Sequence, residues 1–191
     1  MRALSIANIE DKKYDYIPFE GEFAEAFGHR ERGGIWIIYG KSGMGKTRFT
    51  LDLAREFDRI GFNVLFATLE MGICSDFHNE LQAAGIRSRL QRIKFVDELS
   101  VSDLDNYLSK QRSPDVVFID SKNRHVSINI NHHFIKTCQC VFIFLQVTLT
   151  RPKINNKGCH GVTSFIYIHK LTLNFSRKGA MERKKLLSCI F

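Results

Sequence analysis

The segment Gly40-x-x-x-x-Gly45-Lys46-Thr47 contains the residue types and spacing that most directly indicate chemistry. Glycines at 40, 43 and 45 allow the backbone to curl so that several amide groups point at one anion. An apolar run precedes the segment and a helical pattern follows it, so a helix N-terminus would face the same anion. The pattern predicts a phosphate-binding loop, and its alternative is a glycine-rich turn that binds nothing.

Two side chains of this loop would contact the nucleotide and its metal directly. Lys46 would bridge the β- and γ-phosphates of ATP, and the hydroxyl of Thr47 would ligate Mg²⁺. We therefore expect ATP and Mg²⁺ as ligands. The predicted nucleotide-binding residues are Gly40, Lys41, Ser42, Gly43, Met44, Gly45, Lys46, Thr47 and Arg48.

Two carboxylates follow predicted strands elsewhere in the chain. Asp120 ends the apolar run 116–119, and Glu70 follows the run 63–69. Ligands of open α/β sheets bind at the carboxyl ends of the strands. Asp120 is expected there to hold a water of the Mg²⁺ shell, and Glu70 to polarise the attacking water. The alternatives are an aspartate that caps the next turn and an exposed loop glutamate.

The elements that must position these residues follow from the apolar pattern. Continuous apolar runs predict buried strands at 35–39, 63–69 and 116–119, and a further strand is predicted at 92–96. Helical patterns lie between the strands, and Ser100 and Asp103 form a capping-box start for the helix before the fourth strand. This alternation predicts an α/β fold: a three-layer α/β/α sandwich around a mostly parallel sheet.

We expect a single domain over residues 1–191, in three parts. Residues 1–32 are a polar lead-in with a short helix, 33–120 are the nucleotide-binding core, and 121–191 are a basic C-terminal part. A fifth strand is predicted at 141–145. Weaker patterns indicate a short helix within 124–137 and a terminal pair of strands at 165–168 and 171–175.

The stretch GGIWIIYGKSGMGKTRFTLDLAREFDRIGFNVLFATLEM resembles the core of RecA-like P-loop ATPases, including recombinases of the RadA type and DnaB-type helicases. The resemblance covers about residues 30–120 and extends to small RecA-like ATPases of the AAA family from bacteria and phages. It implies a RecA-like sandwich, places the catalytic base on Glu70, and assigns Asp120 to the Walker-B position. It also implies a γ-phosphate sensor after the fifth strand, where Gln146 stands.

The resemblance weakens after Asp120. DSKNRHVSININHH replaces the longer helix of the family, which puts the DNA-contacting loops in doubt. Arg177 or Lys178 resembles the basic finger of hexameric members, but in a loose motif. The spacing of His132, His133, Cys138 and Cys140 does not match a zinc site.

Charge and composition also change at this point. Residues 121–191 hold 12 of the 28 Lys and Arg but one of the 20 acids, while residues 1–120 hold 16 and 19. The basic part could contact DNA. Alanine also nearly disappears there, as an out-of-frame or degenerate reading would produce, and both explanations stay open.

Taken together, these patterns predict an Mg²⁺-dependent ATPase linked to DNA recombination, repair or replication. The alternatives are a module or degenerate remnant that binds ATP without turnover, and an AAA+ helicase-loader-like protein. The loader type would place Glu directly after Asp120, where Ser121 stands. No membrane-length apolar run is present, and an odd cysteine count suits a reducing compartment, so we expect a cytoplasmic protein, and a homo-oligomer stays an open alternative to a monomer.

Overall fold

The structure is a computed structural model that describes residues 3–90, 92–121, 141–147, 162–167, 170–171 and 185–186. The helices are α1 (Ile6–Glu10), α2 (Gly21–Phe27), α3 (Lys46–Arg59), α4 (Ser75–Ala83) and α5 (Val101–Leu108). The strands are β1 (Gly34–Gly40), β2 (Val64–Thr68), β3 (Ile93–Val96), β4 (Val116–Asp120), β5 (Val141–Val147), β6 (Val162–Tyr167), β7 (Lys170–Leu171) and β8 (Lys185–Leu186).

Contacts divide the chain into two compact units, Met1–Arg32 and Gly33–Phe191. In the first unit the predicted short helix is α2, and its aromatic rings Phe23 and Phe27 stack on each other. Helix α1, which the sequence analysis did not predict, starts at a capping box formed by Ser5 and Asn8. The division falls between Arg32 and Gly33, and the predicted domain organisation stays a prediction.

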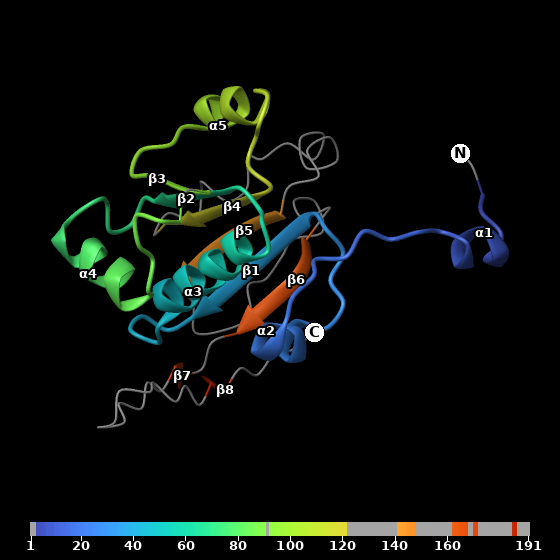
Figure 1. Cartoon of the computed structure of the whole chain (residues 1–191), viewed down its shortest axis with the longest axis horizontal. Coiled ribbons are helices and arrows are strands. Elements are labelled where there is room, and N and C mark those ends of the chain that lie inside the picture. The colour runs from blue at the N-terminus through green and yellow to red at the C-terminus, as the bar shows by residue number, and fades with distance from the viewer. Residues whose placement is uncertain are drawn as a thin grey trace. The chain divides into compact units, whose positions relative to one another are not determined.

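The second unit is built on a parallel sheet of six strands in the order β3-β2-β4-β5-β1-β6 (Figure 1). The four strands predicted from apolar runs before residue 120 are β1 to β4. Strands β2 and β4 are buried along their whole length, as expected for strands covered on both faces. The parallel arrangement follows from the helices that connect β1 to β4.

Helices α3 and α4 cover one face of this sheet. On α3, Phe57 packs its ring edge-on against Phe118 of β4, and on α4 Phe77 packs against Phe66 of β2. Phe66 and Phe118 are register partners whose rings stack at 5.3 Å. All four side chains are almost fully buried. The periodic apolar residues predicted for these two helices therefore form the core on this side.

Helix α5 covers the opposite face. Its Leu104 and Leu108 pack with Leu65, Val117 and Ile119, the strand residues that alternate with the phenylalanines of the other face. Because adjacent strand residues point to opposite sides of a sheet, α5 and α3 must lie on different faces. The predicted α/β fold, with its three layers and mostly parallel sheet, is confirmed.

The predictions beyond residue 120 have mixed outcomes. The fifth strand is present as β5, between β1 and β4. Strand β6 overlaps the run predicted at 165–168 and joins the sheet beside β1, whereas β7 pairs with β8. The helix predicted within 124–137 lies outside the described residues. In the part of the chain that is described, no helix is both long and apolar enough to cross a bilayer.

Candidate nucleotide-binding site

The phosphate loop and Asp120 lie at the same edge of the sheet because β1 and β4 both pair with β5. The register sets Gly40 opposite Val147 and Asp120 opposite Leu145, so the two strand ends are nearly level. Between them, Gln146 lies opposite Tyr39, one residue beyond the partner of Asp120. The backbone of the predicted sensor is therefore at this edge. Its assignment as sensor stays a prediction.

The loop itself has the backbone conformation that its glycines allow. Gly43 has a φ of 74° and Gly45 a φ of 83°, in the left-handed region that side chains disfavour. Gly45 is the N-cap of α3, so the free amides of the first turn of α3 begin at Lys46. The Nζ of Lys46 donates a hydrogen bond of 2.9 Å to the carbonyl oxygen of Lys41, which folds this side chain back over the loop.

The hydroxyl of Thr47 donates a hydrogen bond of 3.2 Å to Oδ2 of Asp120. Strand alternation explains the contact: Asp120 shares a face with Phe118, which packs against α3, and Thr47 is the second residue of that helix. Asp120 is 3% exposed. Residues 73 positions apart in the chain are thus brought into direct contact.

Glu70 is held near Asp120 through the backbone. Its amide donates to the carbonyl oxygen of Asp120 at 3.0 Å, and the amide of Gly72 donates to that of Thr68 at 2.9 Å. Glu70 therefore follows β2 in a tight turn at the strand edge. Burial lowers the pKa of Lys46, and the carboxylates of Glu70 and Asp120 partly oppose this by favouring the charged ammonium.

These groups surround a cavity of about 280 Å³. It is lined by Ser42, Gly43, Gly45, Lys46, Thr47, Arg48, Glu70, Met71, Glu80 and Asp120. The structure thus gathers most of the predicted site residues around one space. Three residues of the predicted loop are not among those that line it: Gly40 ends β1, Lys41 offers its carbonyl to Lys46, and Met44 lies between the glycines of the loop.

Three residues at this edge were not assigned to the site from the sequence. Met71 and Glu80 line the cavity, although Glu80 belongs to α4, ten residues after Glu70. Thr68 is the register partner of Asp120, and its buried Oγ1 has no hydrogen-bond partner within the described structure. The sequence signal for Thr68 was a polar residue at the end of an apolar strand, next to Glu70 in the chain.

Arg48 lies at the border of the cavity and connects α3 to α4. Its guanidinium donates to the carbonyl oxygen of Ala83 and lies 3.7 Å from Asp52 and 4.0 Å from Glu80. Arg55 donates to the carbonyl oxygen of Ala84 at 2.7 Å. Both cations are therefore placed at the C-terminal end of α4, where the helix dipole favours positive charge. The predicted contact of Arg48 with nucleotide stays a prediction.

The residues present fit a magnesium ion bound together with nucleotide phosphates. Mg²⁺ prefers oxygen ligands, and it usually takes one or two protein groups and completes its shell with phosphates and water. Thr47 Oγ1 and Asp120 Oδ2 supply two such oxygens at 3.2 Å from each other, at the edge of the cavity. Thr47 and Asp120 are therefore suited by their chemistry to hold Mg²⁺, and their assignment as its ligands stays a prediction.

Other candidates from the sequence lie outside the described residues. These are the finger candidates Arg177 and Lys178 and the declined zinc candidates His132, His133, Cys138 and Cys140. Within the described residues, no group of three or more histidine, cysteine or acidic side chains could hold a metal by itself.

Comparison with known proteins bears on the fold. No protein-family model matches the sequence, and no curated protein does either. The structure is similar to the flagellar accessory protein FlaH of Methanocaldococcus jannaschii, with a TM-score of 0.55 and 16% identity over 90% of this chain and 85% of that one. It is also similar to the KaiC-like protein PH0186 of Pyrococcus horikoshii, with a TM-score of 0.57 and 19% identity over 88% and 85%. The chain therefore shares the α/β fold of these two structures.

Proposed function

We propose that this protein binds Mg²⁺–ATP in the cavity at the carboxyl edge of the sheet and hydrolyses it. The observation that carries the proposal is the 3.2 Å contact between Thr47 and Asp120, with Lys46 and Glu70 lining the same cavity. This set combines a phosphate loop, two oxygens that suit a metal ion and the carboxylate of Glu70. A turn that bound no ligand would not require them together.

In the proposed reaction, the loop amides and Lys46 surround the β- and γ-phosphates and stabilise the charge that develops on their oxygens. The carboxylate of Glu70 accepts a proton from a water, whose oxygen attacks the γ-phosphorus. The bond from the γ-phosphorus to the bridging oxygen breaks, and ADP and phosphate are released. When bound, Mg²⁺ would offset phosphate charge, held by Thr47 and Asp120.

The test of the catalytic assignment is Glu70→Gln. Glutamine keeps the size of the side chain but cannot accept the proton, so we expect ATP binding to persist and the turnover number to fall by about 100-fold or more. The matched control is Glu98→Gln, an exposed glutamate that follows β3 and does not line the cavity. Equal turnover by Glu70→Gln and the parent would remove Glu70 from the mechanism.

The same measurements distinguish an ATPase from a module that binds without turnover. Isothermal titration with ATP reports binding, and steady-state phosphate release reports hydrolysis. If the parent protein binds Mg²⁺–ATP and releases no phosphate above the rate measured without protein, the binding module is the correct function. That alternative gains support from the composition of residues 121–191, where the sensor and finger candidates lie.

We also propose that hydrolysis is coupled to DNA in a homo-oligomer. The support is the family resemblance and the basic charge of residues 121–191, which hold 12 Lys and Arg against one acid. Single-stranded DNA should then raise the rate of phosphate release, and light scattering after size exclusion should give a mass above the 22.0 kDa of one chain. An unchanged rate with DNA would separate the ATPase from the proposed DNA role.

A further inference from the structure

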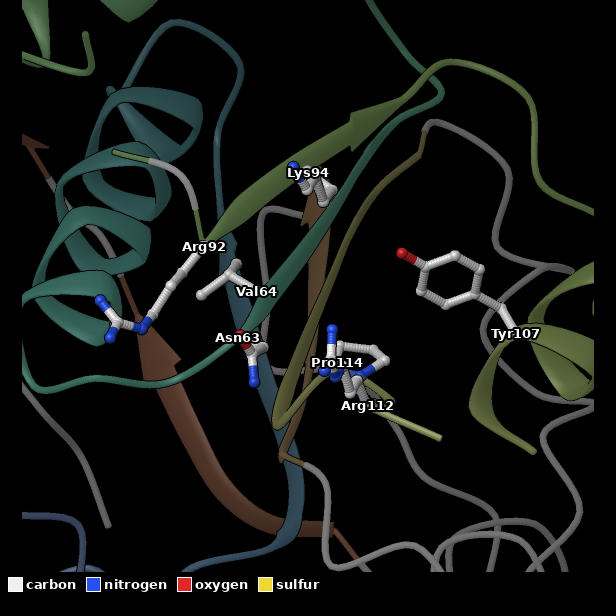
Figure 2. Close-up of a pocket in the computed structure, with 7 residues that line it drawn as sticks. All are labelled: Asn63, Val64, Arg92, Lys94, Tyr107, Arg112 and Pro114. Atoms are coloured by element: carbon white, nitrogen blue, oxygen red, sulfur yellow. The ribbon is translucent and has the colours of Figure 1, made fainter. Parts of the chain in front are cut away.

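A second cavity lies at the end of the sheet where strands β2, β3 and β4 begin, away from the phosphate loop. It has a volume of about 450 Å³ and is lined by Asn63, Val64, Arg92, Lys94, Tyr107, Arg112 and Pro114 (Figure 2). Val64 and Val116 are the first residues of β2 and β4, and the last residue of β4 is Asp120. At about 3.3 Å per residue, the two ends of β4 are roughly 13 Å apart. The cavity is therefore separate from the predicted nucleotide site.

The chain segments around this cavity are strongly basic. Residues 85–96 contain Arg87, Arg89, Arg92 and Lys94 and no acid, and residues 109–114 contain Lys110 and Arg112 and no acid. The surrounding part of the chain, residues 1–120, has more acids than bases, 19 against 16. The topology brings the two basic segments to one edge, because β3 and β4 both pair with β2. Local positive charge of this kind attracts anions.

The cations that line the cavity are available for a ligand. Arg92, Lys94 and Arg112 are exposed, and among the described residues their side chains form no ion pair, in contrast to Arg48, Arg55 and Arg59 of α3. Like charges gathered around a hollow repel one another, and a bound anion relieves that repulsion.

The nearest described carboxylates already accept hydrogen bonds from amides. Asp115 accepts from the backbone amide of Asn63 at 2.9 Å and from its side-chain amide at 3.3 Å. Asp58 is buried and accepts from the backbone amide of Arg92 at 3.3 Å. These contacts hold both carboxylates against amide groups at the strand ends.

The cavity also offers a ring and a hydroxyl. On α5, Leu104 and Leu108 are buried in the core, whereas Tyr107 is 38% exposed. Figure 2 shows its hydroxyl directed toward the strand ends, with Lys94 on β3 on the same side and Arg92 beyond Val64. Arg112 has a φ of 65° and is the one non-glycine residue of the described chain with positive φ. Such conformations cluster at binding sites.

We propose that this cavity is a second anion site, which binds a phosphorylated ligand of nucleotide size. Its phosphates would contact Arg92, Lys94 and Arg112, and its ring would lie near Tyr107 and Pro114. A cavity of about 450 Å³ is within the range for small ligands. The ligand is either a free nucleotide or one nucleotide unit of a single strand, since both present the same phosphate and ring chemistry. The site is independent of hydrolysis at the phosphate loop.

The experiment uses the full chain carrying Lys46→Met, which removes the phosphate-loop cation. Two probes are titrated without Mg²⁺: ADP by calorimetry, and a fluorescent twelve-residue oligothymidylate by anisotropy. The test variant adds Arg92→Ala and Lys94→Ala. The control variant adds Lys12→Ala and Lys13→Ala, which remove the same charge from exposed positions in the first unit.

The test variant should bind the probe at least about tenfold more weakly, and the control variant within about twofold of Lys46→Met itself. If the test variant loses affinity for ADP alone, the ligand is a free nucleotide. If it loses affinity for the oligonucleotide, the ligand is a single strand. The proposal is overturned if neither probe binds the Lys46→Met protein, or if test and control variants lose affinity equally. Circular dichroism should show the same fold for both, because the altered side chains are exposed.

Discussion

Lys46 carries its charge at a position where burial disfavours it. Lys46 is 8% exposed, and burial lowers the pKa of its ammonium group despite the nearby carboxylates of Glu70 and Asp120. A buried charge that lowers folding stability is typical of a binding site. Phosphates bound near the ammonium of Lys46 would offset the free-energy cost of its burial. Lys46 is therefore expected to lower stability in the absence of nucleotide.

We predict that Lys46→Met abolishes ATP binding at the phosphate loop and raises the free energy of unfolding at neutral pH. Between the lowered pKa of folded Lys46 and its ordinary value, the unfolded chain binds more protons, so the stability of the parent rises with pH in that window. The advantage of the variant should therefore shrink as pH rises. Urea unfolding at pH 7 and pH 10 measures this difference, because contributions common to both proteins cancel.

Lys41→Met serves as the control, since the side chain of Lys41 is exposed and its contact with Lys46 uses the backbone carbonyl. It should keep nucleotide binding and show no such difference with pH. A variant at Lys46 that binds ATP as tightly as the parent would contradict the role of this lysine.

Among the elements, α3 and α4 are joined by a buried charge cluster. Asp52 is 1% exposed and lies 3.7 Å from Arg48 and 3.8 Å from Arg55, and the two arginines donate to carbonyl oxygens at the end of α4. Asp52 thus orients both cations. Since α4 follows the turn that contains Glu70, the cluster also helps to hold the loop between β2 and α4.

We predict that Asp52→Ala lowers the free energy of unfolding by about 3 kcal/mol, because it removes the buried carboxylate that lies 3.7 Å from the buried guanidinium of Arg48. Glu56→Ala on the same helix removes an ion pair with Arg59, whose side chain is 47% exposed, and should cost less than about 1 kcal/mol. Urea denaturation of both variants gives the comparison. Equal costs would show that the cluster contributes no more than a surface pair.

Element prediction succeeded where local chemistry decides the structure. The strand runs before residue 120 contain consecutive apolar residues, and helix α5 begins at the predicted capping box, in which Ser100 accepts from the amide of Asp103. Helix α1 was missed because it buries no residue, so it left no apolar period to detect. Strand β6 was expected to form a terminal pair, and its position beside β1 depends on distant pairing that sequence periodicity does not report.

At the scale of the whole molecule, nucleotide should stabilise the second unit. A ligand that binds only the folded state at 100 times its dissociation constant adds about 2.7 kcal/mol. For a domain of this size, that corresponds to a rise of roughly 5–10 °C in Tm. Differential scanning calorimetry with Mg²⁺ and ADP tests this prediction.

The Lys46→Met protein provides the reference for that experiment, because binding at the phosphate loop should be lost while the sheet remains. Its Tm should rise by several degrees less than that of the parent under the same conditions. A parent protein whose Tm stays constant with saturating Mg²⁺–ADP would contradict nucleotide binding at this edge. A similar rise in both proteins would attribute stabilisation to a different site.

By itself, the sequence determined the phosphate loop, the alternation of strands and helices, and the candidate carboxylates, because these depend on neighbours within one turn or strand. Only the tertiary structure decided that Thr47 contacts Asp120, that Glu80 lines the cavity, and that two basic segments meet at the opposite edge. Those contacts depend on strand order and on which face each side chain takes. Both are set by pairing between residues far apart in the chain, which local patterns do not encode.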